Sequence, residues 1–340
     1  MKEVYELTKS LIRTRSDKDR KDEREKALKL LEGRIKERAA STVKYEYLEE
    51  EGTRSLYVTN PAAQGEEVLM CGHVDVIPAS DEQFEPKEDE EYLHGRGAGD
   101  MKAGIALMTE LFIKHHKDKK VSLLITTDEE IGSPHGASHA ADHLEPAMAI
   151  IPEPTENHVV LNQKGGTWVE ITVKGPGGHA SRPWQATNAV DILLDIIQKL
   201  REKRPHPKED AWTDTMNIGS IKGGNLEVKD GEIAMGGANV IADNATAKLD
   251  FRITEETSHE DVWNDVEAAV SEAKERYGED NPLTWRKLTR IAHLATDEDD
   301  PKVKAFMDAC KRATGSAETA KEHGASDGRF FSSKGVPTIV

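Results

Sequence analysis

Three acidic residues, Asp128, Glu129 and Glu130, interrupt the apolar stretch "LLITTDEEIGSPHG" directly after its strand-like beginning. Like charges at the end of a buried strand repel one another, and a cation that neutralises them relieves this cost. Adjacent side chains that leave a strand point in different directions, so one carboxylate can bind while the next stays free. The stretch therefore predicts a cation site at a strand end.

Three further stretches place possible ligands after apolar runs or at a helix start. "VLMCGHVDV" sets His73 and Asp75 two residues apart, so that both face one side of an extended chain, and a carboxylate there can fix the imidazole tautomer. "GRGAGDMKAG" leads through glycines to Asp100, and "AIIPEPTE" holds Glu153 between two prolines. Each motif alone also fits an ordinary turn or helix cap, and only their combination predicts a cation site.

Strand-like and helical stretches alternate over the first half of the chain. "EVLMCG", "VSLLITT" and "AMAIIP" have the composition of strands, and the apolar spacing predicts helices at 2–13, 22–39 and 101–116. This alternation predicts a mainly parallel sheet, whose carboxyl ends meet at one edge, where open α/β folds place their sites. Because the converging ligands are oxygen and nitrogen without thiolate, they favour Zn²⁺, Co²⁺ or Mn²⁺.

The pattern changes near residue 166, where "GTWVEITVKG" alternates apolar and polar residues. Helices are expected at about 186–203 and 258–276, in a strand–helix–strand–strand–helix–strand order that predicts an antiparallel sheet with helices on one face. We therefore predict an α/β catalytic domain (1–165 and 290–340) with an inserted α+β, ferredoxin-like domain (166–289).

Composition limits the partners and the compartment. The 340 residues carry a formal net charge of −17, and no dense Lys/Arg cluster forms a basic groove, which argues against nucleic acid. No apolar run reaches the length of a membrane span, and the N-terminus lacks a signal core. With only two cysteines, the chain is expected in the cytoplasm.

The motifs "GHVDV", "GRGAGDMKAG", "TTDEEIG", "PEPTE" and "GPGGHASRP", in this order, resemble the co-catalytic metallopeptidase family over essentially the whole chain. That family includes succinyl-diaminopimelate desuccinylase, acetylornithine deacetylase, aminoacylase and glutamate carboxypeptidase. The resemblance implies two divalent ions, with Zn²⁺ favoured over Co²⁺ or Mn²⁺, and hydrolysis of an amide bond. It assigns His73 and Glu153 to one metal, Asp100 to a bridge and Glu130 to the other metal.

The same resemblance assigns the remaining roles. Asp75 would orient His73, Glu129 would be the general base on a metal-bridging water, and Asp128 is expected to shape the turn. The inserted domain would be a lid that forms a homodimer, with His179 reaching the partner's site. The resemblance also implies substrate contacts for a further set of residues: Asn239, Arg252, Ser326 and Arg329.

Within the family, the segment "GASDGRFF" favours the desuccinylase branch, and hence removal of an acyl group from an N-succinyl diamino acid or N-acetylornithine. A dipeptidase or carboxypeptidase is the alternative. No GxSxG elbow supports a nucleophile-based hydrolase.

The sequence departs from the family pattern at two places. Gly99 stands where alanine is more common, and family members continue past a strand like "VPTIV" to a further ligand histidine that nothing here matches. We therefore expect a C-terminally shortened version of an active enzyme, with a non-catalytic metal-binding dimer as the rival.

Overall fold

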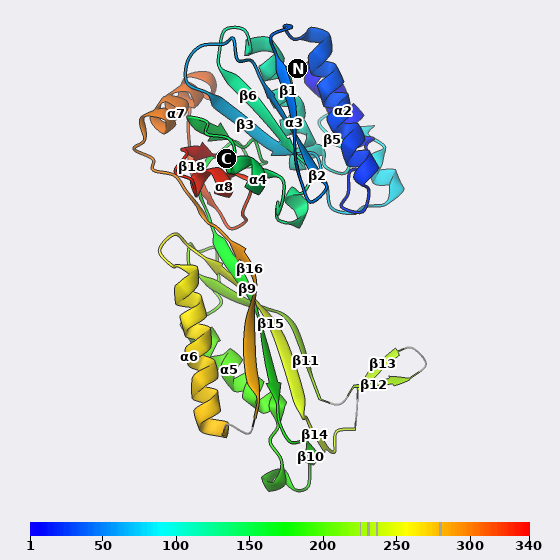
Figure 1. Cartoon of the computed structure of the whole chain (residues 1–340), viewed down its shortest axis with the longest axis vertical. Helices are drawn as coiled ribbons and strands as arrows, with labels where there is room; N and C mark the ends of the chain where they lie inside the picture. The colour runs from blue at the N-terminus through cyan, green and yellow to red at the C-terminus, as the bar shows by residue number, and fades with distance from the viewer. Residues whose placement is uncertain (225, 230–231, 236, 279–280) are drawn as a thin grey trace. The chain divides into compact units, whose positions relative to one another are not determined.

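The computed structural model describes residues 1–224, 226–229, 232–235, 237–278 and 281–340. The chain forms two compact units, one of Met1–Gln163 with Leu294–Val340 and one of Lys164–His293 (Figure 1). Each unit has its own hydrophobic core. Among the described residues, no helix combines the length and the apolar character that crossing a membrane requires.

The first unit is built on a six-stranded sheet with the order β1-β2-β6-β3-β7-β19. In that order, the strands are Lys44–Glu50, Thr53–Thr59, Val121–Thr126, Val68–His73, Met148–Ile150 and Thr338–Ile339. The pairs β6–β3, β3–β7 and β7–β19 are parallel, whereas β1 and β2 add an antiparallel edge. The predicted mainly parallel sheet is thus confirmed.

Helices cover both faces of this sheet, and β6 shows why. Leu123 and Ile125 of β6 pack into a core that includes residues of α1 (Lys2–Ile12), α2 (Lys21–Arg38) and α3 (Ala103–His115). Leu124, which points the other way, packs into a second core. That core takes residues from α4 (Ala137–Ala141) and α8 (Gly328–Ser332). A strand buried on both faces needs apolar side chains on both faces, as Leu123, Leu124 and Ile125 provide at the centre of β6.

A smaller sheet flanks the main one in the order β17-β8-β18. Its middle strand, β8 (Val159–Gln163), pairs with β17 (Leu294–Ala295) and β18 (Thr319–Glu322). Val159 and Leu161 pack with Val303 of α7 (Pro301–Thr314). The sequence analysis does not predict β8, which ties the segment before the inserted unit to the segment after it. A two-stranded ribbon of β4 (Lys87–Glu88) and β5 (Leu93–His94) completes this unit.

The second unit has a four-stranded antiparallel sheet in the order β11-β15-β9-β16. These strands are Thr215–Gly223, Asn244–Ile253, Gly165–Lys174 and Leu283–Ile291. Two helices, α5 (Ala189–Lys203) and α6 (His259–Tyr277), share one core with the sheet. The chain order is β9-α5-β11-β15-α6-β16, which is the predicted ferredoxin-like arrangement. Two short ribbons extend it, β10 (Gly178–His179) with β14 (Val240–Ile241) and β12 (Leu226–Lys229) with β13 (Glu232–Met235).

Candidate metal centre

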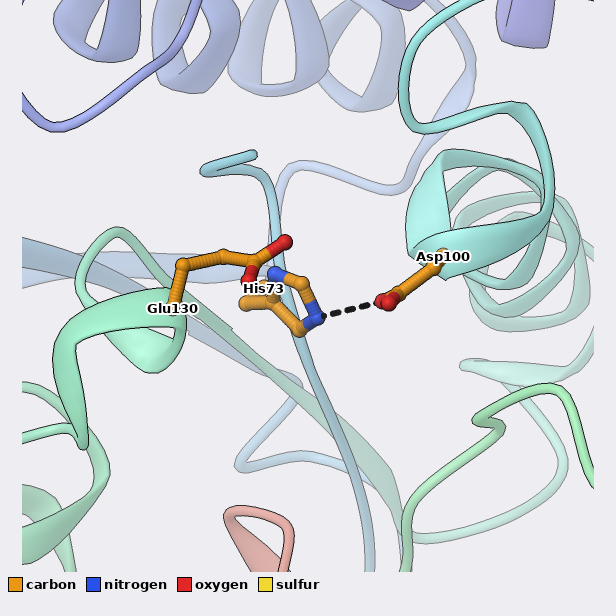
Figure 2. A group of neighbouring side chains, drawn as sticks. All are labelled: His73, Asp100 and Glu130. Carbon is orange, nitrogen blue, oxygen red and sulfur yellow. Dashed lines mark hydrogen bonds and ion pairs between the residues drawn. The ribbon is translucent and has the colours of Figure 1, made fainter. Parts of the chain in front are cut away.

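A cluster of acidic residues surrounds the end of strand β3 in the first unit. His73 is the last residue of β3 and is only 1% exposed. Its Nε2 lies 3.1 Å from Asp100 Oδ1, 3.5 Å from Glu153 Oε1 and 4.0 Å from Glu129 Oε2. Ligand atoms of His73, Asp100 and Glu130 lie within 4.8 Å of one another (Figure 2). The structure thus brings together all four stretches that the sequence singled out.

Asp75 connects two parts of this cluster. His73 Nδ1 lies 3.0 Å from the main-chain oxygen of Asp75 and 3.5 Å from its carboxylate Oδ1. The other carboxylate oxygen of Asp75 accepts a hydrogen bond of 2.9 Å from the Glu130 amide. A donor N–H on Nδ1 leaves Nε2 as the nitrogen that faces the carboxylates. Asp75 therefore contacts the imidazole through its main-chain oxygen and the Glu130 turn through its side chain, and its role in orienting His73 stays a prediction.

Asp100 reaches the cluster from the wide turn η2 (Ala98–Lys102), which leads directly into α3. Gly97 opens the turn with a φ of 76°, and a Cβ there would lie 2.6 Å from Val76 Cγ1. On the other side, a Cβ on Gly104 would lie 2.5 Å from the carbonyl oxygen of Pro152. The start of α3 therefore packs against the backbone immediately before Glu153, which a side chain at Gly104 would prevent.

The turn η3 (Glu129–Ile131), which carries Glu129 and Glu130, is held from both sides. Asp128 Oδ2 accepts hydrogen bonds from the amides of His135 (2.9 Å) and Gly136 (3.0 Å), as expected for a residue that shapes the turn. Asp327 accepts hydrogen bonds from the hydroxyls of Thr126 (2.8 Å) and Ser133. Asp327 is not among the residues predicted from the sequence, although it lies inside the "GASDGRFF" segment.

Crowding of buried carboxyls changes their proton affinities. Burial, and next the charge of Asp327, raises the pKa of Glu129 to about 8. Burial likewise raises the pKa of Glu153 to about 7. For His73, burial acts to lower the pKa, but the hydrogen bonds with Asp100 and Asp75 outweigh it and hold the pKa well above its usual value. Protons thus occupy positions that a cation can take, and one imidazole with several carboxylates suits a divalent ion.

Ser326 and Arg329 are buried in the first unit. Ser326 Oγ donates a 2.8 Å hydrogen bond to Gln163. The guanidinium of Arg329 donates to the carbonyl oxygens of Ser326 and Gly132, each at 2.7 Å. Arg329 therefore binds the loop that follows Glu130, and its contact with substrate stays a prediction.

The remaining predicted residues lie in the second unit. His179 and Asn239 are neighbours, because β10 pairs with β14 and the Ala180 amide donates to Asn239 O at 2.8 Å. Both side chains are exposed. Arg252 lies on β15 and donates to the Asp250 carboxylate at 3.0 and 3.1 Å. The roles assigned to these three residues stay predictions.

Residues 69–340 match the sequence profile of peptidase family M20/M25/M40. The chain is 32% identical over 297 residues to a succinyl-diaminopimelate desuccinylase from Shewanella piezotolerans, covering 79% of this chain and 72% of that protein. A protein of the same name from a Nitratiruptor species is 27% identical over 308 residues, covering 85% and 79%.

Solved structures share the fold. The aminopeptidase PepT from Bacillus cereus aligns with a TM-score of 0.78 at 17% identity, covering 99% of this chain and 89% of that one. An M20 family metallo-carboxypeptidase from Sulfolobus solfataricus aligns with a TM-score of 0.74 at 17% identity, covering 100% and 91%. The motif resemblance is confirmed: the chain belongs to peptidase family M20/M25/M40, whose members are metal-dependent hydrolases of amide bonds.

Proposed function

We propose that this chain removes an acyl group from an N-acyl amino acid, with an N-succinyl diamino acid as the preferred substrate class. The observation that carries the proposal is the carboxyl of Glu129, only 16% exposed, beside the His73, Asp100 and Glu130 group. The substrate class is supported by the 32% identical relative that is named a succinyl-diaminopimelate desuccinylase.

In the proposed site, His73 and Glu153 would hold one divalent ion and Glu130 would hold a second, with Asp100 available to both. Zn²⁺ is the first candidate, followed by Co²⁺ and Mn²⁺. Such ions supply Lewis acidity, which acidifies water and polarises a carbonyl. Glu129 accepts the proton of the attacking water and returns it to the leaving amine.

The oxyanion that develops during amide hydrolysis needs a hydrogen-bond donor, and we assign this role to His179 of a second copy in a homodimer. The Ser181 amide donates to His179 Nδ1 at 3.2 Å, which places the ring proton on Nε2. An exposed Nε2–H is the form of the imidazole that can donate to an oxyanion. Losing such a donor typically lowers the rate by about 10²–10³.

Substrate identity is tested with a panel of N-succinyl and N-acetyl amino acids and dipeptides, each with Zn²⁺, Co²⁺ or Mn²⁺. We expect the N-succinyl diamino acid to have the highest kcat/KM, and Asp100→Asn to abolish both metal binding and turnover. Faster cleavage of dipeptides would make the chain a peptidase instead. Metal binding without hydrolysis of any substrate would reject the catalytic proposal.

The proposed trans contact is tested by mixing two inactive variants, His179→Ala and Glu129→Gln. If His179 acts across a dimer, mixed dimers combine an intact Glu129 with the other copy's intact His179 and regain activity. If each subunit uses its own His179, the mixture stays inactive. Sedimentation of the same mixtures shows whether dimers form.

A further inference from the structure

Three histidines and one glutamate gather on the surface of the first unit, away from the cluster at His73. His135, His139 and His143 are spaced four residues apart on and around α4, and Glu50 ends β1. His135 Nδ1 lies 3.3 Å from Glu50 Oε2, and His139 Nδ1 lies 3.6 Å from Glu50 Oε1. One carboxylate therefore lies between two imidazoles, with each oxygen facing a different ring.

The third imidazole lies against the second, with the two ring planes tilted by 47°. The rings of His139 and His143 have centroids 4.4 Å apart, as expected for residues four apart along a helical segment. His143 Nδ1 lies 2.8 Å from the main-chain oxygen of His139, so this nitrogen carries the proton. The lone pair of His143 is then on Nε2, which is the arrangement that metal-binding histidines show when a carbonyl fixes their tautomer.

The backbone under the cluster is packed against an apolar core, whereas the side chains are exposed enough to adjust. Leu48 of β1 packs into the same apolar core as Ala140 and Ala141 of α4, which fixes the strand against the helix. His143 is exposed and His135, His139 and Glu50 are partly so, which lets their rings and carboxylate rotate. Zinc bonds of about 2.0–2.1 Å in tetrahedral geometry place ligand atoms about 3.3–3.5 Å apart. The 3.3 Å from His135 Nδ1 to one Glu50 oxygen falls in this span, and the 3.6 Å from His139 Nδ1 to the other oxygen lies just outside it.

We propose that Glu50, His135, His139 and His143 form a second transition-metal site, which binds Zn²⁺. Imidazoles with one carboxylate favour Zn²⁺ and similar ions over Ca²⁺ or Mg²⁺. The ion would tie β1 to the segment that begins at His135, whose amide is held by Asp128 in the Glu129–Glu130 loop. This site does not depend on the proposed function, because it shares no ligand with the cluster at His73.

The test uses the whole chain and reads each histidine separately. The protein is treated with diethyl pyrocarbonate, which modifies unprotonated imidazoles, with and without excess Zn²⁺, and each histidine is quantified by mass spectrometry. Zn²⁺ should slow modification of His139 and His143 about tenfold when free Zn²⁺ exceeds Kd by about tenfold, since the unliganded fraction falls in that proportion. Reading individual residues separates this site from His73.

Two controls decide the outcome. His158 lies 3.6 Å from Glu318 in a pair with a single imidazole, and it should show no comparable protection. Glu50→Gln should weaken the protection of His139 and His143 by at least about tenfold, because it removes the only charged ligand. The proposal fails if Zn²⁺ does not protect these histidines, if His158 is protected equally, or if Glu50→Gln leaves the protection unchanged.

Discussion

Gly104→Ala should weaken metal binding although Gly104 contacts no metal ligand directly. Gly104 lies in the first turn of α3, four residues after Asp100, and an added Cβ would lie 2.5 Å from Pro152 O. Ordinary contacts begin near 3.4 Å, so the helix and the Pro152 backbone have to separate by about 0.9 Å. The obstacle is a backbone oxygen, which cannot rotate out of the way as a side chain can.

This separation acts on two proposed ligands at once. Asp100 precedes the helix and Glu153 follows Pro152, and both now face the Nε2 of His73, at 3.1 and 3.5 Å. Metal sites tolerate errors of about 0.2 Å in ligand distance, so a shift of about 0.9 Å exceeds this tolerance severalfold. We expect a loss of about 10–100-fold in metal affinity, as found for changes that misplace ligands. Overpacking should also cost about 1–3 kcal/mol of folding stability.

Gly33→Ala is the matched control. Gly33 lies within α2, and a Cβ there meets nothing within 4 Å. Replacing a helical glycine by alanine should raise the free energy of unfolding by about 0.5–1 kcal/mol and leave the metal centre unchanged. Zn²⁺ affinity is measured by competition with a chromophoric chelator, and stability is measured by urea unfolding.

The reasoning is refuted if Gly104→Ala binds Zn²⁺ as tightly as Gly33→Ala and is equally stable. That result would mean that the contact with Pro152 relaxes without moving Asp100 or Glu153. A loss of stability with unchanged metal affinity would also reject the proposed link between helix packing and ligand position.

Three further predictions concern other parts of the chain. Glu129→Gln should keep its bound metal but lose about 10²–10⁴ in kcat, as measured by metal content and an amidase assay, because a general base is removed; wild-type turnover would contradict this role. Asp327→Asn should accelerate amide hydrogen exchange across the Glu129–Glu130 turn and lower the free energy of unfolding by about 1–3 kcal/mol. An amide side chain has one oxygen, so it cannot accept hydrogen bonds from both Thr126 and Ser133 as the carboxylate does. Burial lowers the pKa of His259, so the unfolded chain takes up the proton first, and stability present above about pH 6.5 is lost as pH falls. When urea unfolding is measured from pH 8 to pH 5, the free energy of unfolding should fall less for His259→Gln than for the wild type. An equal fall with pH in both proteins would contradict a contribution from His259.

The position of the proposed ligands was predictable because each follows a recognisable local pattern. β3 and β6 are short apolar strands, and in a parallel pair their carboxyl ends meet, so His73 and the acids after Thr126 had to come close. Two other groups could not be predicted in this way. Thr126 and Asp327 are 201 positions apart, and Glu50 and His135 are 85 positions apart. No local periodicity reports such contacts, because tertiary packing alone brings them together.

The hydrogen-bond partners of buried polar residues also cannot be predicted from the sequence. The family resemblance implied that Arg329 contacts the substrate, and an arginine is well suited to bind a carboxylate. In the structure, its guanidinium donates to two carbonyl oxygens, one of them in the loop after Glu130. A sequence shows that an arginine has donors but not whether the backbone already uses them, so its contact with substrate stays a prediction.

The three consecutive acids now have three different environments, which explains how one strand end can carry them. Burial raises the pKa of Asp128 to about 6, although two amide donors partly stabilise its charge. Glu129 is the most strongly perturbed, with a pKa of about 8, while Glu130 is partly exposed and tied by its amide to Asp75. The cost of ionising these carboxyls, which comes first from burial and next from neighbouring charges, is therefore largest at Glu129. A divalent ion that replaces protons in this cluster recovers that cost, so the fold's unfavourable electrostatics become a source of metal affinity.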